Sequence, residues 1–279
     1  MSTAPVPLRR RLIAEFLGSA FLAALVIGSG IAAQRLSPGQ TGLELLENSA
    51  VTAAGLFAII LMFGPVSGGH FNPVVSFTDA AFGGLSWRDA AAYLPAQVAG
   101  CTAGAVLANL MFALPAVSIS AKHRASGAHF LSEVIATLGL LLVIFALARS
   151  GRGRTAPAAV GAYIGAAYWF TSSTSFANPA ITIGRMFSDT FAGIAPASAP
   201  AFIGAQILGA ALAIAVIKTL YPAITPADAA GVIVPHDSNA REPGRAGPRR
   251  TVQRRRPAGR LARPGPTEPT GGSLPCTWS

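Results

Sequence analysis

Six long stretches of this sequence contain no aspartate, glutamate, lysine or arginine. Most of them reach or approach the ~20 apolar residues that an α-helix needs to cross ~30 Å of hydrocarbon. Only 11% of the 279 residues are charged, whereas about 25% is usual in soluble domains. The sequence therefore predicts an all-α membrane protein with six transmembrane helices, in the stretches Phe16–Gln34, Asn48–Thr78, Ala90–Ala121, Val134–Ala148, Thr155–Gly184 and Thr190–Ile217.

The two halves of the chain repeat each other. AEFLGS (14–19), GHFNPVVSF (69–77) and PAQVAG (95–100) in the first half correspond to SEVIAT (132–137), SFANPAITI (175–183) and GAQILG (204–209) in the second. Three landmarks keep their order at separations of 118, 106 and 109 residues, namely Glu15/Glu133, Asn72/Asn178 and Gln97/Gln206. With three helices per half, the second copy must lie inverted. Inverted repeats with interrupted apolar segments mark a pathway near the bilayer midplane.

Asn72-Pro73 and Asn178-Pro179 interrupt apolar stretches at corresponding places. Asparagine is a favoured helix N-cap and proline suits the first helical turn. Non-helical backbone at membrane depth must be buried in protein or line a watery cavity. Each pair is therefore predicted to begin a half-helix inside the membrane, the second over Pro179–Phe187. The two N-termini, each with about half a positive charge, should meet at the centre.

These motifs resemble those of the aquaporin and aquaglyceroporin family over residues 11–221. The resemblance rests on AEFLGS, SGGHFNPVVS (67–76), FANPA (176–180) and the repeat itself. It implies six helices plus two re-entrant half-helices, repeats at about 11–121 and 128–221, a pore in each subunit and a homotetramer. It also implies that asparagine side chains donate hydrogen bonds to the permeating molecule, from a pore motif of Asn72, Pro73, Val74, Asn178, Pro179 and Ala180. Val74 departs from the alanine that is usual at its position.

The resemblance further implies a constriction that selects solutes at the outer end of the pore. Counting without gaps places Thr52, Ala166, Ser175 and Ile181 there. Ile181 stands three residues after the motif asparagine, where the family normally has an arginine. This set is small and mostly apolar, as in bacterial aquaporins that lack the arginine. We therefore expect a wide opening without a cationic clamp.

Two glutamates and a histidine each have more than one interpretation. Glu15 and Glu133 lie within apolar stretches, where an acid is functional by default and could form a proton relay. The resemblance favours a structural role instead, in which each accepts hydrogen bonds from the buried loop of its own half. His70 is either a pH gate or pore ligand, or a packed and hydrogen-bonded residue.

Arg185 and two aspartates lie near the predicted half-helices. Arg185 lies four residues after Ile181 and on the same helical face. It either guards the outer vestibule or extends to the membrane interface. Asp79 and Asp189 are expected at the outward ends of the half-helices, as solvated carboxylates.

The predicted function is a passive channel for water and small uncharged solutes. Candidate solutes are glycerol-like polyols, urea and metalloid hydroxides such as arsenous acid. The alternative is an ion-coupled secondary transporter, which also uses inverted repeats but would need more acidic ligands than Glu15 and Glu133. An enzyme is not expected, because four histidines and two remote cysteines, Cys101 and Cys276, form no constellation of nucleophile, base and metal ligands. We expect no cofactor and no metal site.

Basic residues suggest the orientation of the chain. They flank the N-terminus at 9–11 and the loop at 149–154, and this bias places both termini of a multi-pass protein of the inner (plasma) membrane in the cytoplasm. Residues 1–221 form the predicted channel domain. Residues 222–279 hold 9 basic and 4 acidic residues among many prolines and glycines. That composition predicts a disordered cytosolic tail that contacts anionic lipid weakly, rather than a nucleic-acid-binding segment.

Overall fold

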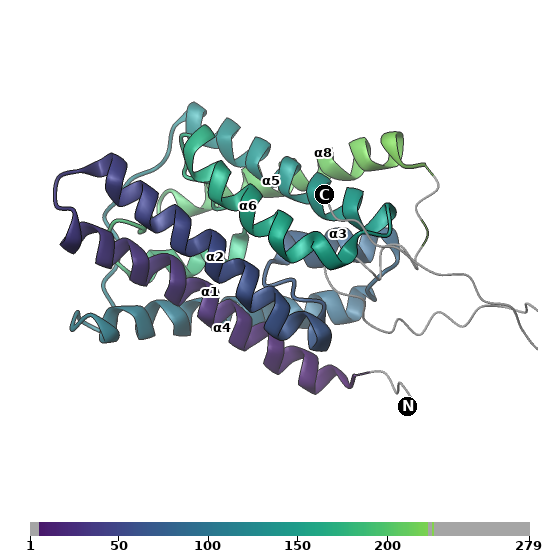
Figure 1. Ribbon diagram of the computed structural model, residues 1–279, viewed down its shortest axis with the longest axis horizontal. Helices are drawn as coiled ribbons and strands as arrows, with labels where there is room; N and C mark the ends of the chain where they lie inside the picture. The colour runs from purple at the N-terminus through teal and green to yellow at the C-terminus, as the bar shows by residue number, and fades with distance from the viewer. Residues whose placement is uncertain (1–5, 223–224, 226–279) are drawn as a thin grey trace, which may run out of the picture. The chain divides into compact units, whose positions relative to one another are not determined.

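Helices form the regular secondary structure of residues 6–222 and 225, which are the residues that the computed structural model describes (Figure 1). The predicted tail, apart from positions 222 and 225, lies outside the described residues, as does Cys276. The α-helices are α1 (Leu8–Leu36), α2 (Thr41–Ser67), α3 (Pro73–Phe82), α4 (Trp87–Met111), α5 (Gly127–Arg149), α6 (Ala156–Phe170), α7 (Pro179–Gly184) and α8 (Ala199–Leu220), and two 3₁₀ turns are η1 (Gly153–Thr155) and η2 (Arg185–Phe187).

Five of the described helices, α1, α2, α4, α5 and α8, are long and apolar enough to cross a membrane by length and composition. The sixth predicted crossing is shorter than expected. Its helix α6 has 15 residues, which extend about 23 Å at 1.5 Å per residue. The turn η1 directly precedes α6 and lengthens this crossing. The stretch Thr155–Gly184 is thus divided into α6, a loop and α7.

The short helices α3 and α7 begin where the Asn-Pro pairs predict. Asn72 and Asn178 are the N-caps, and Pro73 and Pro179 occupy the first turns. The predicted half-helix Pro179–Phe187 consists of α7 followed by the 3₁₀ turn η2.

The loops that lead into α3 and α7 have the same backbone form, with three left-handed positions each, and only the first loop has glycines at two of them. Gly68 and Gly69 have φ of 92° and 66°, and the corresponding Thr174 and Ser175 have 63° and 49°. A residue with a Cβ atom is uncommon in this region. The second loop therefore adopts a backbone that its own residues do not favour.

The helices pack in two equivalent groups. Helix α1 packs against α4, and its counterpart α5 packs against α8. Glycines allow the close approach, because a Cβ atom at Gly209 would lie 2.6 Å from the carbonyl oxygen of Val134. The equivalent glycine, Gly100, meets the carbonyl of Phe16 in the same way. Small residues at such contacts are characteristic of helix packing in membranes.

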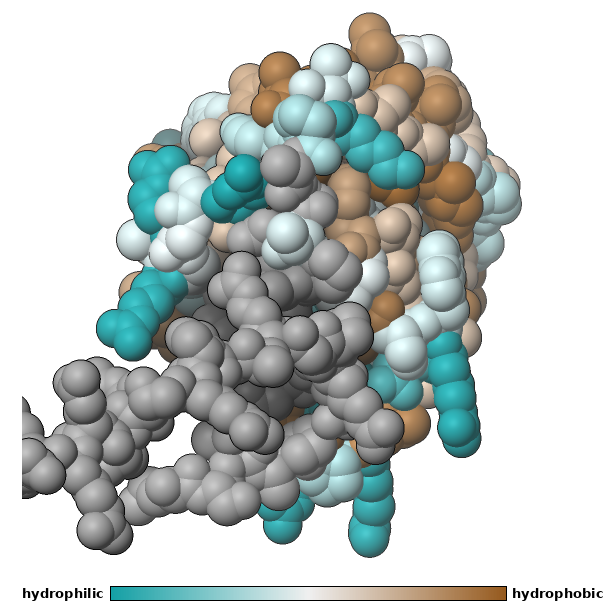
Figure 2. Space-filling model, turned by 90° about the vertical axis from the view of Figure 1, so that its right-hand side faces the viewer, coloured by the Kyte–Doolittle hydropathy of each residue, from teal (hydrophilic) through white to brown (hydrophobic). Residues whose placement is uncertain are grey.

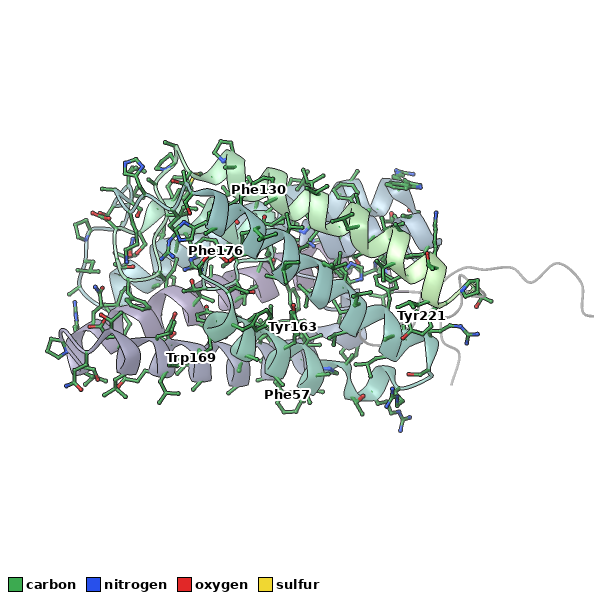
Figure 3. The ribbon with its side chains drawn as sticks, turned by 90° about the horizontal axis from the view of Figure 1, so that it is seen from above. Phe57, Phe130, Tyr163, Trp169, Phe176 and Tyr221 are labelled. Atoms are coloured by element: carbon green, nitrogen blue, oxygen red, sulfur yellow. The ribbon has the colours of Figure 1, made fainter. Side chains whose placement is uncertain are left out.

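Apolar side chains cover the flanks of this helical bundle, and polar ones gather at its ends. Figure 2 shows hydrophilic side chains near the end that carries the start of α1, with hydrophobic ones on the adjoining flank. Phe57 and Trp169 lie at the edge of the bundle, whereas Phe176 lies inside it (Figure 3). We call the end with the start of α1 and the end of α8 the terminal end. The end with residues 37–40 and 113–126 is the loop end (Figure 1).

We expect the variant Gly209→Ala to be less stable than the wild type by about 1–3 kcal/mol, because the added methyl group overpacks the contact with α5. The measurement is thermal unfolding of the purified protein in detergent. Gly204→Ala in the same helix is the matched control, since its Cβ atom would meet no heavy atom within 4 Å. Equal destabilisation by both variants would contradict the packing argument.

Candidate functional site

Two reciprocal hydrogen bonds join the half-helices at their N-termini. The side-chain amide of Asn72 donates to the carbonyl of Ala177, and that of Asn178 donates to the carbonyl of Phe71, both at 2.8 Å. Each Asn Oδ1 meanwhile accepts from the first turn of its own half-helix, at Val74 N in α3 and at Ala180 N in α7. The two N-termini are therefore held face to face, with one amide N–H of each asparagine left for another acceptor.

Glu15 and Glu133 hold the non-helical backbone that precedes each half-helix. Each carboxylate accepts four hydrogen bonds, from a serine hydroxyl, two backbone N–H groups and a glutamine amide. The donors to Glu133 are Ser173 Oγ at 2.6 Å, Phe176 N, Ala177 N and Gln206 Nε2. Both glutamates are fully buried. Their bonds follow the structural interpretation, in which each glutamate accepts hydrogen bonds from the buried loop of its own half, and not that of a proton relay.

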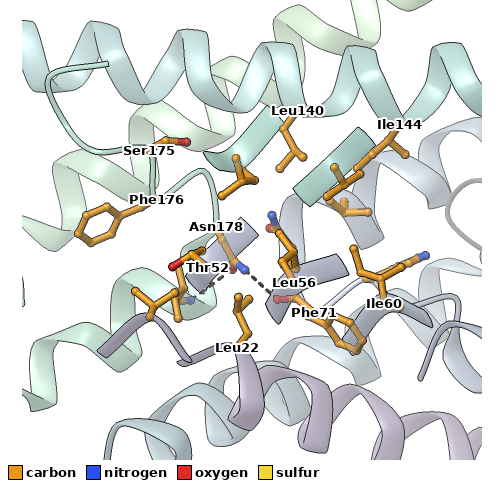
Figure 4. Close-up of a pocket in the computed structure, with 18 of the residues that line it drawn as sticks. Leu22, Thr52, Leu56, Ile60, Phe71, Leu140, Ile144, Ser175, Phe176 and Asn178 are labelled. Atoms are coloured by element: carbon orange, nitrogen blue, oxygen red, sulfur yellow. Dashed lines mark hydrogen bonds between the residues drawn. The ribbon is translucent and has the colours of Figure 1, made fainter. Parts of the chain in front are cut away.

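A cavity runs past the two motif asparagines. The centre of a water molecule can occupy about 50 Å³ of it, whereas one water needs ~10–15 Å³. Figure 4 shows Thr52, Ser175, Phe176 and Asn178 around this space. Its wall is mainly aliphatic and aromatic, with a few polar side chains, namely Thr52, His70, Asn72, Tyr168, Ser175, Asn178 and Arg185. A narrow, largely apolar passage with sparse polar groups suits small solutes that can lose their hydration.

Three of the four residues expected at the constriction line this cavity, and one does not. Thr52, Ser175 and Ile181 are buried lining residues. The expectation for Ala166 is wrong, because this residue is exposed on the outer face of α6. Tyr168 of α6 lines the cavity instead, and its hydroxyl is 3.2 Å from the hydroxyl of Thr52. A large polar side chain therefore replaces the small one that was expected.

Arg185 is buried and lines the same cavity, with 2% of its surface exposed. The interpretation that it extends to the membrane interface is therefore wrong, as is the expected absence of a cationic group near Ile181. Its Nε donates to the carbonyl of Ala192, and its Cζ lies 3.4 Å from the centroid of the Phe176 ring. Hydrogen bonding and stacking together fix the guanidinium against the Phe176 ring and the Ala192 carbonyl.

The expected solvated position of Asp79 is also wrong. Asp79 is fully buried, and its Oδ2 lies 3.6 Å from Nε2 of His70. His70 lines the cavity on the terminal-end side of the asparagines, and its Nδ1 is 3.0 Å from Ser76 Oγ. Asp189, in contrast, is exposed at the loop end and accepts from the backbone N–H of Ala121 at 3.0 Å.

Basic residues bind the loop-end segments to each other. Lys122 Nζ donates to the carbonyl of Phe191 at 2.9 Å, and Arg124 Nε donates to that of Gly193 at 2.9 Å. Partial burial of the ammonium group, together with the charges of Arg124 and Arg185, lowers the pKa of Lys122 to about 8. The ammonium group of Lys122 is therefore charged below about pH 8 and loses its charge above it.

Tyr168 and Phe176 line the cavity, and the motif reasoning did not predict either of them. Position 176 corresponds to position 70 at the repeat separation of 106 residues, so the candidate residue His70 is a signal for Phe176. Tyr168 has no such signal, because its orientation depends on where α6 begins. No group of three or more His, Cys, Asp and Glu residues that could hold a metal ion occurs among the described residues.

Residues 2–177 match the model of a protein family described as major intrinsic protein. Aquaglyceroporin AqpS of Rhizobium meliloti (strain 1021) is 48% identical over 213 residues, which cover 76% of this chain and 91% of that protein. The glycerol uptake facilitator protein of Pseudomonas aeruginosa is 33% identical, with 82% of this chain and 96% of that protein covered.

The fold is similar to that in the X-ray structure of the aquaglyceroporin from Plasmodium falciparum. The TM-score is 0.61 at 22% sequence identity, and the alignment covers 78% of this chain and 99% of that one. At this identity the similarity concerns the fold alone, with its bundle of long helices and two re-entrant half-helices.

We expect Glu133→Gln to lower the stability of the protein by roughly 2–6 kcal/mol, since two buried donors then face an amide NH₂ and each lost bond costs about 1–3 kcal/mol. Thermal unfolding in detergent measures the loss. Glu44→Gln is the control, because the backbone N–H of Gly39 donates to Oε1 of Glu44, and the side-chain oxygen of a glutamine can accept the same bond. Unfolding of both variants at the wild-type temperature would contradict this structural role.

Proposed function

Because the chain belongs to the major intrinsic protein family, we propose that it is a passive membrane channel for water and small uncharged, glycerol-like solutes. The observation that carries the proposal is the pair of bonds Asn72–Ala177 and Asn178–Phe71. These bonds hold two half-helix N-termini at one point of a cavity that both asparagines line. The remaining amide N–H groups can donate to the oxygen of a passing solute.

The half-helix N-termini also account for the exclusion of cations. Each contributes about half a positive charge, and the guanidinium of Arg185 adds a full charge on the loop-end side. Positive half-helix ends exclude protons and cations in aquaporin-type pores. An uncharged solute with hydroxyl oxygens meets hydrogen-bond donors at this point and no electrostatic barrier. The chain belongs to a channel family, not to an enzyme family.

The chain is an integral membrane protein, with apolar side chains exposed on its flanks, such as Phe21, Leu61 and Met62. We place it in the inner (plasma) membrane with the terminal end, and hence both termini, in the cytoplasm. The basic residues of the 149–154 loop support this orientation. The same apolar flanks would contact lipid and three further copies in a homotetramer. No feature of the described residues favours an ion-coupled transporter.

The absence of an arginine at position 181 supports passage of solutes larger than water. The side chain of Ile181 lines the cavity beside Thr52, Ser175 and Tyr168. It provides an apolar surface where a guanidinium would narrow the passage and donate hydrogen bonds. We therefore extend the proposed solutes to polyols, urea and neutral metalloid hydroxides such as arsenous acid. Tyr168 presents a larger side chain to this space than the alanine that was expected there.

In proteoliposomes we expect Ile181→Arg to reduce glycerol permeability at least tenfold and to change water permeability little, because the guanidinium fills space that glycerol needs. Stopped-flow light scattering measures both permeabilities on the same vesicles. Ile181→Leu is the matched control, since it conserves volume and apolar character.

Unchanged glycerol permeability in Ile181→Arg would contradict the role of this position. Wild-type vesicles should also transport glycerol down its gradient in the presence of a protonophore. Loss of that flux would contradict a passive channel and would favour ion coupling.

A further inference from the structure

The hydroxyl of Ser175 is a buried polar group that has no hydrogen-bond partner among the described residues. Ser175 is 3% exposed and lines the cavity. Its backbone is left-handed, with φ of 49°, and such a conformation costs free energy in a residue with a Cβ atom. Buried polar groups in proteins are nearly always hydrogen-bonded. A strained backbone that presents an unpaired hydroxyl to a cavity indicates a position that binds a ligand.

The guanidinium of Arg185 is also only partly paired. Its Nε donates to the carbonyl of Ala192, and among the described residues no acceptor is hydrogen-bonded to either Nη atom. Arg185 is buried and lines the same cavity as Ser175. Every polar hydrogen of a guanidinium is a donor, and the group has no acceptor. The N–H groups of both Nη atoms therefore remain for a molecule in the cavity.

A second guanidinium contacts the same aromatic ring but is occupied by carbonyl groups. The Cζ atom of Arg124 lies 5.4 Å from the centroid of the Phe176 ring. Its Nε donates to the carbonyl of Gly193 at 2.9 Å, and its Nη2 donates to that of Phe191 at 3.2 Å. Arg124 is not among the residues that line the cavity. Of these two guanidiniums, that of Arg185 is therefore the one that a solute meets.

Ser175 and Arg185 lie at the same end of the cavity. Phe176 follows Ser175 in the chain, and its ring stacks on the Arg185 guanidinium, with 3.4 Å from Cζ to the ring centroid. Figure 4 shows Ser175 and Phe176 at the opposite end of the cavity from Ile60. Unpaired donors and an unpaired hydroxyl thus meet the same part of the passage.

The first half of the protein does not repeat this pair. At the repeat separation of 106 residues, Gly69 stands at the position of Ser175 and Asp79 at that of Arg185. A glycine has no side chain to offer, and an ionised aspartate is an acceptor only. The combination of guanidinium donors with a hydroxyl therefore belongs to the loop-end half of the passage alone.

We propose that Arg185 and Ser175 form a solute-binding site on the loop-end side of the asparagines, which takes uncharged solutes with two neighbouring hydroxyl groups. The planar fork of a guanidinium can donate to two neighbouring oxygens at once, and Ser175 Oγ accepts the hydrogen of one of these hydroxyls. Vicinal diols have this form, as do hydroxyl groups on one central atom in an undissociated oxyacid. The site rests on the proposed channel function and names the solute class that the channel prefers.

Two isomeric diols test the site in proteoliposomes of the full chain. Propane-1,2-diol has its hydroxyls on neighbouring carbons, whereas propane-1,3-diol has the same atoms with the hydroxyls further apart. Stopped-flow light scattering gives both permeabilities, from which the value for protein-free vesicles is subtracted. We expect the wild type to conduct propane-1,2-diol about threefold or more faster, since a hydrogen bond of ordinary strength is lost when the hydroxyls are separated.

Two variants should bring this ratio of permeabilities close to one. Arg185→Lys keeps the charge and can still donate to the Ala192 carbonyl, but a lysine has no fork. Ser175→Gly removes the hydroxyl and should also raise the unfolding temperature, because glycine readily adopts a left-handed backbone. Thr174→Gly is the matched control. Thr174 has φ of 63° and is not among the lining residues, so this variant should gain stability and keep the wild-type ratio.

A wild-type ratio of one would overturn the site and leave the channel proposal intact. A ratio that stays at the wild-type value in Arg185→Lys and Ser175→Gly would also overturn it, as would an equal fall in Thr174→Gly, which would assign the effect to the backbone. If Arg185→Lys does not fold, Ser175→Gly still decides, since it is expected to be more stable than the wild type. If neither diol nor glycerol crosses faster than in protein-free vesicles, the channel proposal fails and the site with it.

Discussion

The arrangement of the pore depends on the two carboxylates that hold non-helical backbone inside the membrane. A chain can leave the helix at this depth only if its backbone groups find partners within the protein. Glu15 and Glu133 each accept from two backbone N–H groups, a serine and a glutamine. This fixes the loops before α3 and α7. The positions of Asn72 and Asn178, and hence of the cavity wall, follow from it.

The two halves share this framework and differ in the side chains that fill it. Left-handed positions with Gly68 and Gly69 in one copy have Thr174 and Ser175 in the other. Residues with a Cβ atom cost free energy there, of order 1–3 kcal/mol each. The second loop places the buried side chain of Ser175 on the cavity wall, where a glycine offers only backbone. The second half therefore has a polar side chain on the cavity wall where the first half has a glycine, and the backbone that carries this side chain is strained.

The sequence predicts most of the framework and less of the cavity wall. The long uncharged stretches predict the crossings, and each Asn-Pro pair predicts the start of a half-helix at the residue where it occurs. Counting along the chain predicts the wrong residue of α6 at the constriction, Ala166. The face that α6 turns to the cavity depends on where η1 ends and α6 begins. The burial of Asp79 and Arg185 could not be predicted either. A charged residue within an apolar stretch can point to the lipid headgroups or into the protein, and the surrounding sequence does not distinguish the two.

The two copies of the repeat carry residues of different charge type at equivalent positions, an aspartate in the first and an arginine in the second. Asp79 lies beside the ring of His70, and Arg185 lies on the ring of Phe176. An arginine remains charged at any physiological pH. Its charge and those of the half-helix N-termini therefore persist at any physiological pH. Exclusion of cations at the centre and on the loop-end side therefore stays constant across the physiological pH range.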